Sequence, residues 1–304
     1  AFRTEALAVL GEYNKSASSP FLPMYEKLRD LAFERHTYKH TTIGFLADVK
    51  AMPGYYQYSL DFFKRFYRPE NVTLLVVGDA QPERVVALAK KYYGDWKPGY
   101  QTPAVQPEPP QKEKKTAHLD WPSPIHPQMM IGWHAPSSSS ADSAALDLIE
   151  QILLGETSPL HQELVVDKQW VDFIQGSAQP HRDPYLFMVV ARAKSDDLVP
   201  KVQAALDQAI AQLESQPVDP QRLERIKSHL RYAFALSLDN ASAVADQAAE
   251  TIAVAGDVGE INRRFAQYQK VTPADIQRVA REVFRPQNET IVTLSHPETK
   301  GGAR

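Results

Sequence analysis

The same short pattern occurs twice in this sequence. Residues 67–75 read YRPENVTLL and residues 284–292 read FRPQNETIV, so both copies place R-P-x-N-x-T between an aromatic residue and an apolar run. The two copies are offset by 285 − 68 = 217 residues. Four matching letters in six can arise by chance, but the matching flanks favour the duplication of one supersecondary unit. The repeat therefore predicts two similarly built domains.

A proline-rich stretch separates the two halves. Five prolines, at positions 98, 103, 107, 109 and 110, fall between residues 97 and 111, which is typical of a semi-extended linker. We assign residues 1–97 to the C-terminal part of the first domain, 98–115 to the linker and 116–304 to the second domain. The first domain has far fewer residues before its copy of the repeat. We therefore expect roughly 100 of its residues to precede Ala1.

Hydrophobic periodicity predicts helices and strands in both halves. The expected fold class is therefore α+β: two homologous α/β sandwich domains, the first truncated at its N-terminus. In the first half we expect an N-terminal helix, helices at 23–33, 55–67 and 82–93, and a buried strand at 74–77. We expect the aromatic residues of the 55–67 helix to pack in the core. In the second half we expect strands at 116–121, 128–134, 170–176, 185–193 and 290–295, and helices at 142–154, 196–215, 220–238, 242–255, 261–269 and 273–284.

Composition excludes several classes of protein. With 43% hydrophobic and 23% charged residues among 304, the chain has the makeup of an ordinary globular protein. A formal net charge of −3 gives no reason to expect nucleic acid. No apolar run approaches the roughly 18 residues that a membrane-spanning helix needs. Cysteine is absent, which leaves His, Asp and Glu as the strong metal ligands. There is no G-x-S-x-G elbow, which argues against a serine hydrolase.

Two glutamates stand out in the opening helix. Glu5 and Glu12 are seven residues apart, so both project from one helix face, about 10 Å apart along the axis. The residues between them are apolar and carry no compensating charge. A metal ligand with an accessory acid beside it has this pattern. The alternative is two exposed glutamates at the frayed start of a surface helix.

A second metal signal is weaker. His36 and His40 have the i, i+4 spacing of a zinc pair on a helix. However, the residues around them are mostly threonine and tyrosine, which are poor helix formers. We therefore expect the two imidazoles not to share a helix face.

Taken together, these segments resemble the insulinase and pitrilysin metallopeptidases, the inverzincins, in their two-domain bacterial and processing-peptidase branch. The resemblance rests on E-x6-E at Glu5 and Glu12, on H-T-Y and I-G within residues 36–44, and on the repeated R-P-x-N segment. It covers essentially the whole chain. In this family an H-x-x-E-H helix supplies two zinc-binding histidines and a general base. The resemblance implies that Glu12 is the third zinc ligand and Glu5 the accessory acid, with both histidine ligands upstream of Ala1.

The sequence departs from the family at two points. H-x-x-E-H does not occur in the 304 residues. The family's substrate-binding R-x6-Y would fall at Val165 and Asp172, which do not match, while Arg182 and Tyr185 are only three apart. The resemblance therefore implies the zinc-bearing member of a pair, with a second subunit of the same fold that carries the Arg and Tyr.

The resemblance implies a zinc-dependent endopeptidase subunit that hydrolyses peptides in a chamber between domains. The chain as given lacks the zinc motif, and we expect it to be inactive alone. The alternative is a non-catalytic, processing-peptidase-like scaffold or peptide-binding subunit. The resemblance also implies the bacterial periplasm or cell envelope, with the cytoplasm as the alternative.

Overall fold

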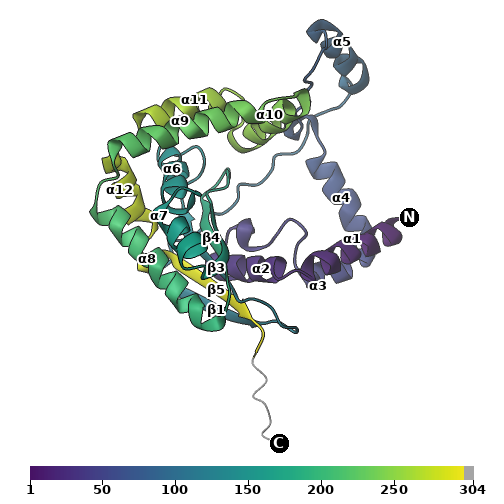
Figure 1. Ribbon diagram of the computed structural model, residues 1–304. Helices are drawn as coiled ribbons and strands as arrows, with labels where there is room; N and C mark the ends of the chain where they lie inside the picture. Colours follow the sequence, from purple (N-terminus) through teal and green to yellow (C-terminus); the bar gives the residue numbers. More distant parts are fainter. Residues whose placement is uncertain (298–304) are drawn as a thin grey trace, which may run out of the picture.

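The protein is built around one five-stranded sheet. A computed structural model describes residues 1–297, so positions 298–304 of the predicted second domain lie outside the described residues (Figure 1). The strand order is β1-β5-β2-β4-β3. β1 pairs in parallel with β5, and the other neighbours are antiparallel. The strands are β1 (Lys115–Asp120), β2 (Gln128–Ala135), β3 (Val171–Ser177), β4 (Tyr185–Ala193) and β5 (Glu289–Ser295).

The inner strands are covered on both faces. β2 and β4 read QMMIGWHA and YLFMVVARA, and nearly all of their residues are buried. Such continuous apolar runs are typical of strands that are packed on both sides. The edge strand β1 reads KTAHLD and is half-buried only at alternate residues, as expected where one face meets solvent.

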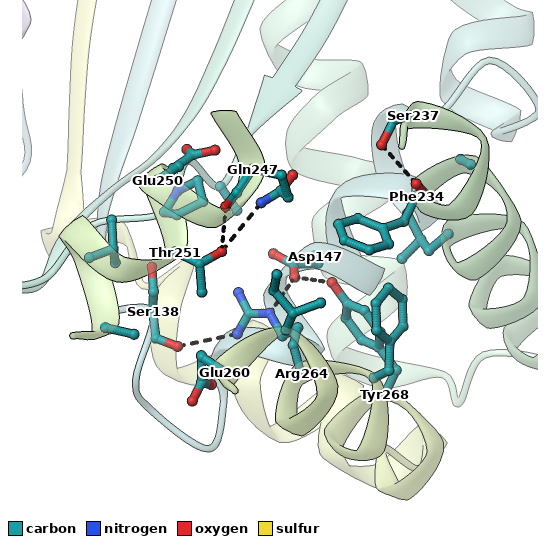
Figure 2. A pocket seen from close by; sticks show the side chains of 18 residues that line it. Ser138, Asp147, Phe234, Ser237, Gln247, Glu250, Thr251, Glu260, Arg264 and Tyr268 are labelled. Atoms are coloured by element: carbon teal, nitrogen blue, oxygen red, sulfur yellow. Dashed lines mark hydrogen bonds and ion pairs between the residues drawn. The ribbon is translucent and has the colours of Figure 1, made fainter. Parts of the chain in front are cut away.

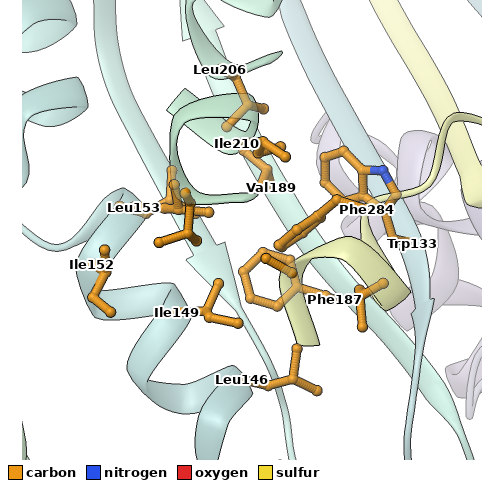
Figure 3. Close-up of a cluster of buried hydrophobic side chains, with 14 of the residues drawn as sticks. Trp133, Leu146, Ile149, Ile152, Leu153, Phe187, Val189, Leu206, Ile210 and Phe284 are labelled. Atoms are coloured by element: carbon orange, nitrogen blue, oxygen red, sulfur yellow. The ribbon is translucent and has the colours of Figure 1, made fainter. Parts of the chain in front are cut away.

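Helices of the second half cover one face of the sheet (Figure 1). Their core is centred on Phe284, which lies edge-on to Trp133 and to Phe187 with ring centroids 5.2 Å apart in both pairs (Figure 3). Such edge-to-face pairs contribute about 0.5–1.5 kcal/mol beyond their burial. The helices of this layer are α6 (Ser143–Leu154), α8 (Val199–Ser215) and α12 (Pro273–Val283).

Three further helices lie outside this layer and have clear sequence signals at their ends. The Asp219 carboxylate accepts two N–H groups at the start of α9, and Asn240 Oδ1 accepts one at the start of α10, as N-caps do. Gly256, with φ +75°, ends α10 in the left-handed conformation that glycine tolerates best. The elements are α7 (Pro159–His161), η4 (Gln162–Asp167), η5 (Asp196–Leu198), α9 (Pro220–Ser237), α10 (Ala241–Ala255) and α11 (Glu260–Lys270).

The other face of the sheet is covered by α2 (Phe21–Ala32), from the N-terminal part of the chain (Figure 1). Met24 and Leu28 of α2 are fully buried in one cluster with Met130, Leu186 and Val292 of the sheet. A β-carbon added at Gly132 would lie 3.3 Å from the Leu28 side chain, so helix and strand approach closely there. The N-terminal helices and the sheet therefore share a core.

The sequence repeat is also a structural repeat. At the offset of 217 residues, α4 (Tyr56–Phe66) coincides with α12, and η3 (Pro69–Asn71) coincides with η6 (Pro286–Asn288). α1 and α9 correspond to within a few residues. The remaining elements of the first half are α1 (Phe2–Ala17), η1 (Thr37–Lys39), α3 (Leu46–Ala51), η2 (Met52–Gly54) and α5 (Pro82–Tyr93).

Two predictions for the first half are wrong for the described residues. Residues 74–77, predicted to form a buried strand, pair with no strand among residues 1–297, and Leu74 is 57% exposed. The aromatic residues of α4, predicted to pack in the core, are also open to solvent, with Tyr58 and Phe63 59% and 57% exposed. A strand needs hydrogen-bonding partners and an apolar helix face needs a surface to cover it. Residues 1–297 supply neither here.

The proline-rich stretch is extended, as predicted, but it is also pinned at two points. Glu108 accepts hydrogen bonds from the backbone N–H groups of Glu34, Arg35 and His36, which holds its pKa below the usual range despite partial burial. Gln111 donates to the backbone carbonyls of Gln287 and Glu289. The stretch therefore ties the N-terminal helices to the end of the sheet.

The α+β class is confirmed by the mixed sheet and its helices. Residues 1–297 contain one sheet only, so the division into two homologous domains stays a prediction. Within these residues no helix is both long and apolar enough to cross a membrane.

Candidate functional site

The two glutamates predicted to serve a metal lie on the exposed side of α1. Ala6 and Tyr13 form the buried stripe of this helix, and each of them directly follows one of the glutamates. The Tyr13 hydroxyl donates to Glu26 of α2 at 2.8 Å. Burial and the nearby Glu26 carboxylate raise the pKa of Tyr13 to about 12, so it stays a donor at neutral pH. This anchor fixes the rotation of α1 and keeps Glu5 and Glu12 facing outward.

Neither carboxylate is engaged by the rest of the described chain. Glu5 and Glu12 are exposed and take part in no hydrogen bond or ion pair within residues 1–297. No group of three His, Asp or Glu side chains in this part of the protein could hold a metal. A catalytic zinc site needs three protein ligands. The oxygen donors fit such a site, but these residues alone do not complete it.

The other histidine pair is not a metal site. His36 and His40 stand at opposite ends of the short turn η1, so they do not share a helix face, as predicted. His36 is buried, and its Nδ1 accepts the N–H of Tyr38 at 3.0 Å. Its Nε2 lies 3.5 Å from the Asp183 carboxylate. His40 instead contacts the carbonyl of Thr41. His36 therefore organises the turn rather than a ligand.

Next to His36 is an aromatic junction that the sequence did not reveal. The hydroxyls of Tyr25 and Tyr185 are 2.5 Å apart, and Arg29 lies over both rings. His181 stacks on Tyr185 at 3.6 Å, and burial lowers the pKa of this imidazole. Because Tyr185 is only 2% exposed, it cannot meet a substrate. The junction joins α2 to the loop that precedes β4.

We expect Tyr25→Phe to lower the free energy of unfolding by about 1–2 kcal/mol. The change removes the hydrogen bond to Tyr185 and leaves that buried hydroxyl without its partner. Urea unfolding measures the effect. Tyr92→Phe, at a residue 69% exposed, is the matched control and should change nothing. Equal stability of both variants and the parent would show that the junction is not stabilising.

The positions at which the family carries R-x6-Y have structural roles here. Val165 lies in η4 and Asp172 in β3. The Asp172 carboxylate binds His126 at 2.9 Å and Arg192 at 2.7 Å, which lowers its pKa. Arg182 is exposed and contacts only its neighbour Asp183. The described residues therefore present no Arg and Tyr pair for substrate.

A cavity of about 440 Å³ opens between α6, α9, α10 and α11 (Figure 2). Arg264 lies at its base, with Nε 3.1 Å from the Asp147 carboxylate, and the Tyr268 hydroxyl donates to the same carboxylate at 2.5 Å. Burial raises the pKa of Asp147, while Arg264 opposes that shift. Phe234 and Phe265 line the apolar part. The polar groups satisfy one another, so the cavity is suited to an apolar side chain.

The signal for these acids was present in the sequence. Helix α6 reads SAALDLIEQILL, so Asp147 and Glu150 are acids without a nearby base on an apolar helix, like Glu5 and Glu12 of α1. Burial raises the pKa of Glu150 to about 7, although it accepts the N–H of Ala178 at 2.9 Å. Acids in such a setting indicate buried, shifted groups.

Glu150 makes a specific contribution to the pH dependence of stability. Its folded pKa is raised, so the unfolded chain loses this proton at lower pH than the folded one. Stability from Glu150 is thus present below about pH 4.5 and is lost as pH rises to about 7, by up to about 3 kcal/mol. Glu150→Gln should remove this loss. We expect the stability difference between the two proteins to grow from pH 4.5 to 7; a constant difference would contradict the shifted pKa.

Sequence comparison places the chain among peptidases. Residues 56–230 match the family described as Peptidase M16 inactive domain. The zinc protease PqqE of Helicobacter pylori is 26% identical over 296 residues, which cover 92% of this chain and 63% of that protein. The chain therefore spans less than two thirds of the length of this relative.

Solved structures share the fold. A protease from Helicobacter pylori superposes with a TM-score of 0.89 at 25% identity, covering 97% of this chain and 72% of that one. An M16 inactive domain from Pseudomonas fluorescens gives 0.79 at 16% identity, covering 97% and 70%. The periplasmic protease PqqL of Escherichia coli gives 0.71 at 11% identity, covering 97% and 32%, and these last two show the fold alone. The chain belongs to the M16 peptidase family, that of insulinase and pitrilysin, and the part matched by the family is of the inactive-domain type.

Proposed function

We propose that this chain is part of a zinc endopeptidase subunit in which Glu12 is the third zinc ligand and Glu5 the accessory acid. The observation that carries the proposal is the pair of unengaged carboxylates on one face of α1 in a chain of the M16 family. The two histidine ligands would come from an H-x-x-E-H helix outside residues 1–304. Without that helix, the chain would be inactive.

The chemistry divides between the metal and the chain. Zinc held by two imidazoles and a carboxylate supplies a bound water of lowered pKa and polarises the scissile carbonyl. Glu12 would hold one position of that site. Glu5, on the same helix face, would orient a neighbouring ligand or shift its pKa. Tyr13 serves both by fixing α1 against α2 through Glu26.

We also propose that residues 1–97 belong to a first domain whose sheet covers the exposed apolar segments. The repeat supports this, because Leu74 and Leu75 correspond at the 217-residue offset to Ile291 and Val292, which are 5% and 0% exposed within their sheet. Exposed apolar patches of this size mark surfaces that pack against something else. Strands outside residues 1–304 would pair with residues 72–77.

Substrates would be extended peptides. β3 is an edge strand, and no strand among residues 1–297 pairs with its outer side. Such an edge can bind a peptide in extended form through backbone hydrogen bonds. Because the R-x6-Y positions are Val165 and Asp172, we propose that a second subunit of the same fold supplies the Arg and Tyr.

A non-catalytic role is the second candidate. The family match is to an inactive domain, and no metal-binding group lies within the described residues. In that case the chain would be a scaffold or a peptide-binding subunit, and Glu5 and Glu12 would be surface acids.

Peptide cleavage separates the two candidates. The assay uses an unstructured fluorogenic peptide and compares this chain, this chain joined to its H-x-x-E-H segment, and the joined protein mixed with a same-fold subunit carrying R-x6-Y. We expect cleavage only in the mixture, and its loss on adding a zinc chelator. A mixture with bound zinc but no cleavage of any peptide would favour the non-catalytic role.

A further inference from the structure

An open pocket of about 1030 Å³ lies between α6, α9 and the end of β3. It is separate from the cavity around Arg264. One wall is formed by Arg222, Arg225 and His229 of α9, and the opposite wall includes Glu150, Gln151 and Gln175. No part of the proposed zinc site uses these residues.

The α9 wall carries unneutralised positive charge. Arg222, Arg225 and His229 follow one another at i, i+3 and i+7, which places them on one helix face. None of the three forms an ion pair within residues 1–297. Arg222 is half-buried, and its Nη2 donates to the carbonyl of Ile152 at 2.9 Å. Burial and the neighbouring Arg225 lower the pKa of Arg222, so two like charges are held side by side without a counterion.

The opposite wall offers hydrogen bonds with little negative charge. Glu150 accepts the N–H of Ala178 at 2.9 Å, and burial raises its pKa to about 7, so near neutral pH it is partly protonated and can itself donate. Gln151 and Gln175 contribute neutral amides. The acid at the rim, Glu156, is exposed to solvent. An anion between the walls would meet two guanidinium groups and polar partners.

The repeat shows how the charge at this place has changed. At the offset of 217 residues, Arg222 corresponds to Glu5 and His229 to Glu12. The helix that carries two carboxylates in the first half thus carries two basic groups in the second. The first set is suited to a cation and the second to an anion.

The position of the pocket favours a peptide as the source of that anion. The pocket reaches Gln175 and Gly176, which belong to the edge strand β3. A β-carbon at Gly176 would clash with Leu154, so only glycine lets β3 approach α6 here. An extended chain lying along β3 would end at the arginines.

We propose that this pocket binds the C-terminal carboxylate of a peptide, with Arg225 and Arg222 as its partners. The proposal rests on the proposed function only in taking a peptide as the ligand; it requires neither zinc nor cleavage. Bidentate guanidinium–carboxylate pairs are among the stronger and more directional hydrogen-bonded contacts. Arg225 is exposed and supports no other described residue, so it can be changed without disturbing α9.

Calorimetric titration of the 304-residue chain tests this. Three forms of one unstructured octapeptide are compared: a free C-terminus, an amidated C-terminus, and an amidated C-terminus with one internal Glu. We expect the free form to bind at least ~10-fold more tightly than the simple amide. Tight binding by the internal-Glu form alone would assign the pocket to acidic side chains and overturn the C-terminal proposal.

Variants locate the effect. Arg225→Gln should abolish the preference for the free carboxylate, while Arg231→Gln, on the same helix but outside the pocket, should preserve it. Equal binding of free and amidated peptides would overturn this proposal and leave the proposed peptidase function standing. The failure of the peptidase function is read separately, from the cleavage assay.

Discussion

Glu12→Gln is expected to remove zinc from the protein that unites this chain with an H-x-x-E-H helix. A neutral amide oxygen is a poorer zinc donor than a carboxylate, and a three-ligand site depends on each of its ligands. Glu12 is exposed and makes no hydrogen bond or ion pair with other described residues, so the fold should be unaffected. Metal analysis after dialysis and peptide cleavage measure the result. Both zinc and activity should fall to background.

Glu5 and an unrelated glutamate make this experiment specific. Glu5→Gln removes the accessory acid but no ligand, so zinc should be retained at saturation while activity falls by about 10–100-fold. Glu83→Gln, at an exposed position of α5, should match the parent in both measurements. If the Glu12 variant keeps a full equivalent of zinc, Glu12 is not a ligand.

The largest stability effect is expected at the Asp147–Arg264 pair. Asp147→Ala would leave Arg264 with a buried, uncompensated charge and take the acceptor from the Tyr268 hydroxyl. Both side chains of the ion pair are only about one fifth exposed. Breaking such a pair by removing one partner costs about 3–5 kcal/mol. Denaturant unfolding of the two proteins should show this difference.

A double variant tells the charge effect from loss of packing. Asp147→Leu combined with Arg264→Met removes both charges and keeps apolar volume, and it should regain most of the stability lost by Asp147→Ala. Asp197→Ala, which breaks an exposed ion pair with Lys201, should cost less than about 1 kcal/mol. A double variant as unstable as Asp147→Ala would show that the pair stabilises by its own attraction.

Local patterns in the sequence predicted most elements of the second half. β4 was expected at 185–193 and spans Tyr185–Ala193, and α9 was expected at 220–238 and spans Pro220–Ser237. A continuous apolar run defines the first, and Asp219 with Pro220 marks the start of the second. The repeat predicted more than elements, because α4 and α12 coincide at its offset.

Contacts between distant segments could not be predicted. Leu28 packs on Val292, and Asp147 meets Arg264, across more than a hundred residues in each case. Periodicity shows that a face is apolar, but not which surface covers it. For the same reason residues 74–77 read as a buried strand although none of the described residues cover them. The charged wall of α9 is visible in the sequence, but the pocket it lines depends on α6 and β3.

Locating the zinc tests the central claim most directly. Anomalous diffraction at the zinc edge, from crystals of this chain joined to its H-x-x-E-H segment, would place the metal relative to α1. The account predicts one zinc with a Glu12 carboxylate oxygen about 2.0–2.2 Å away and Glu5 on the same face without direct coordination. A zinc bound without Glu12, or a protein that contains the motif and binds no zinc, would contradict it.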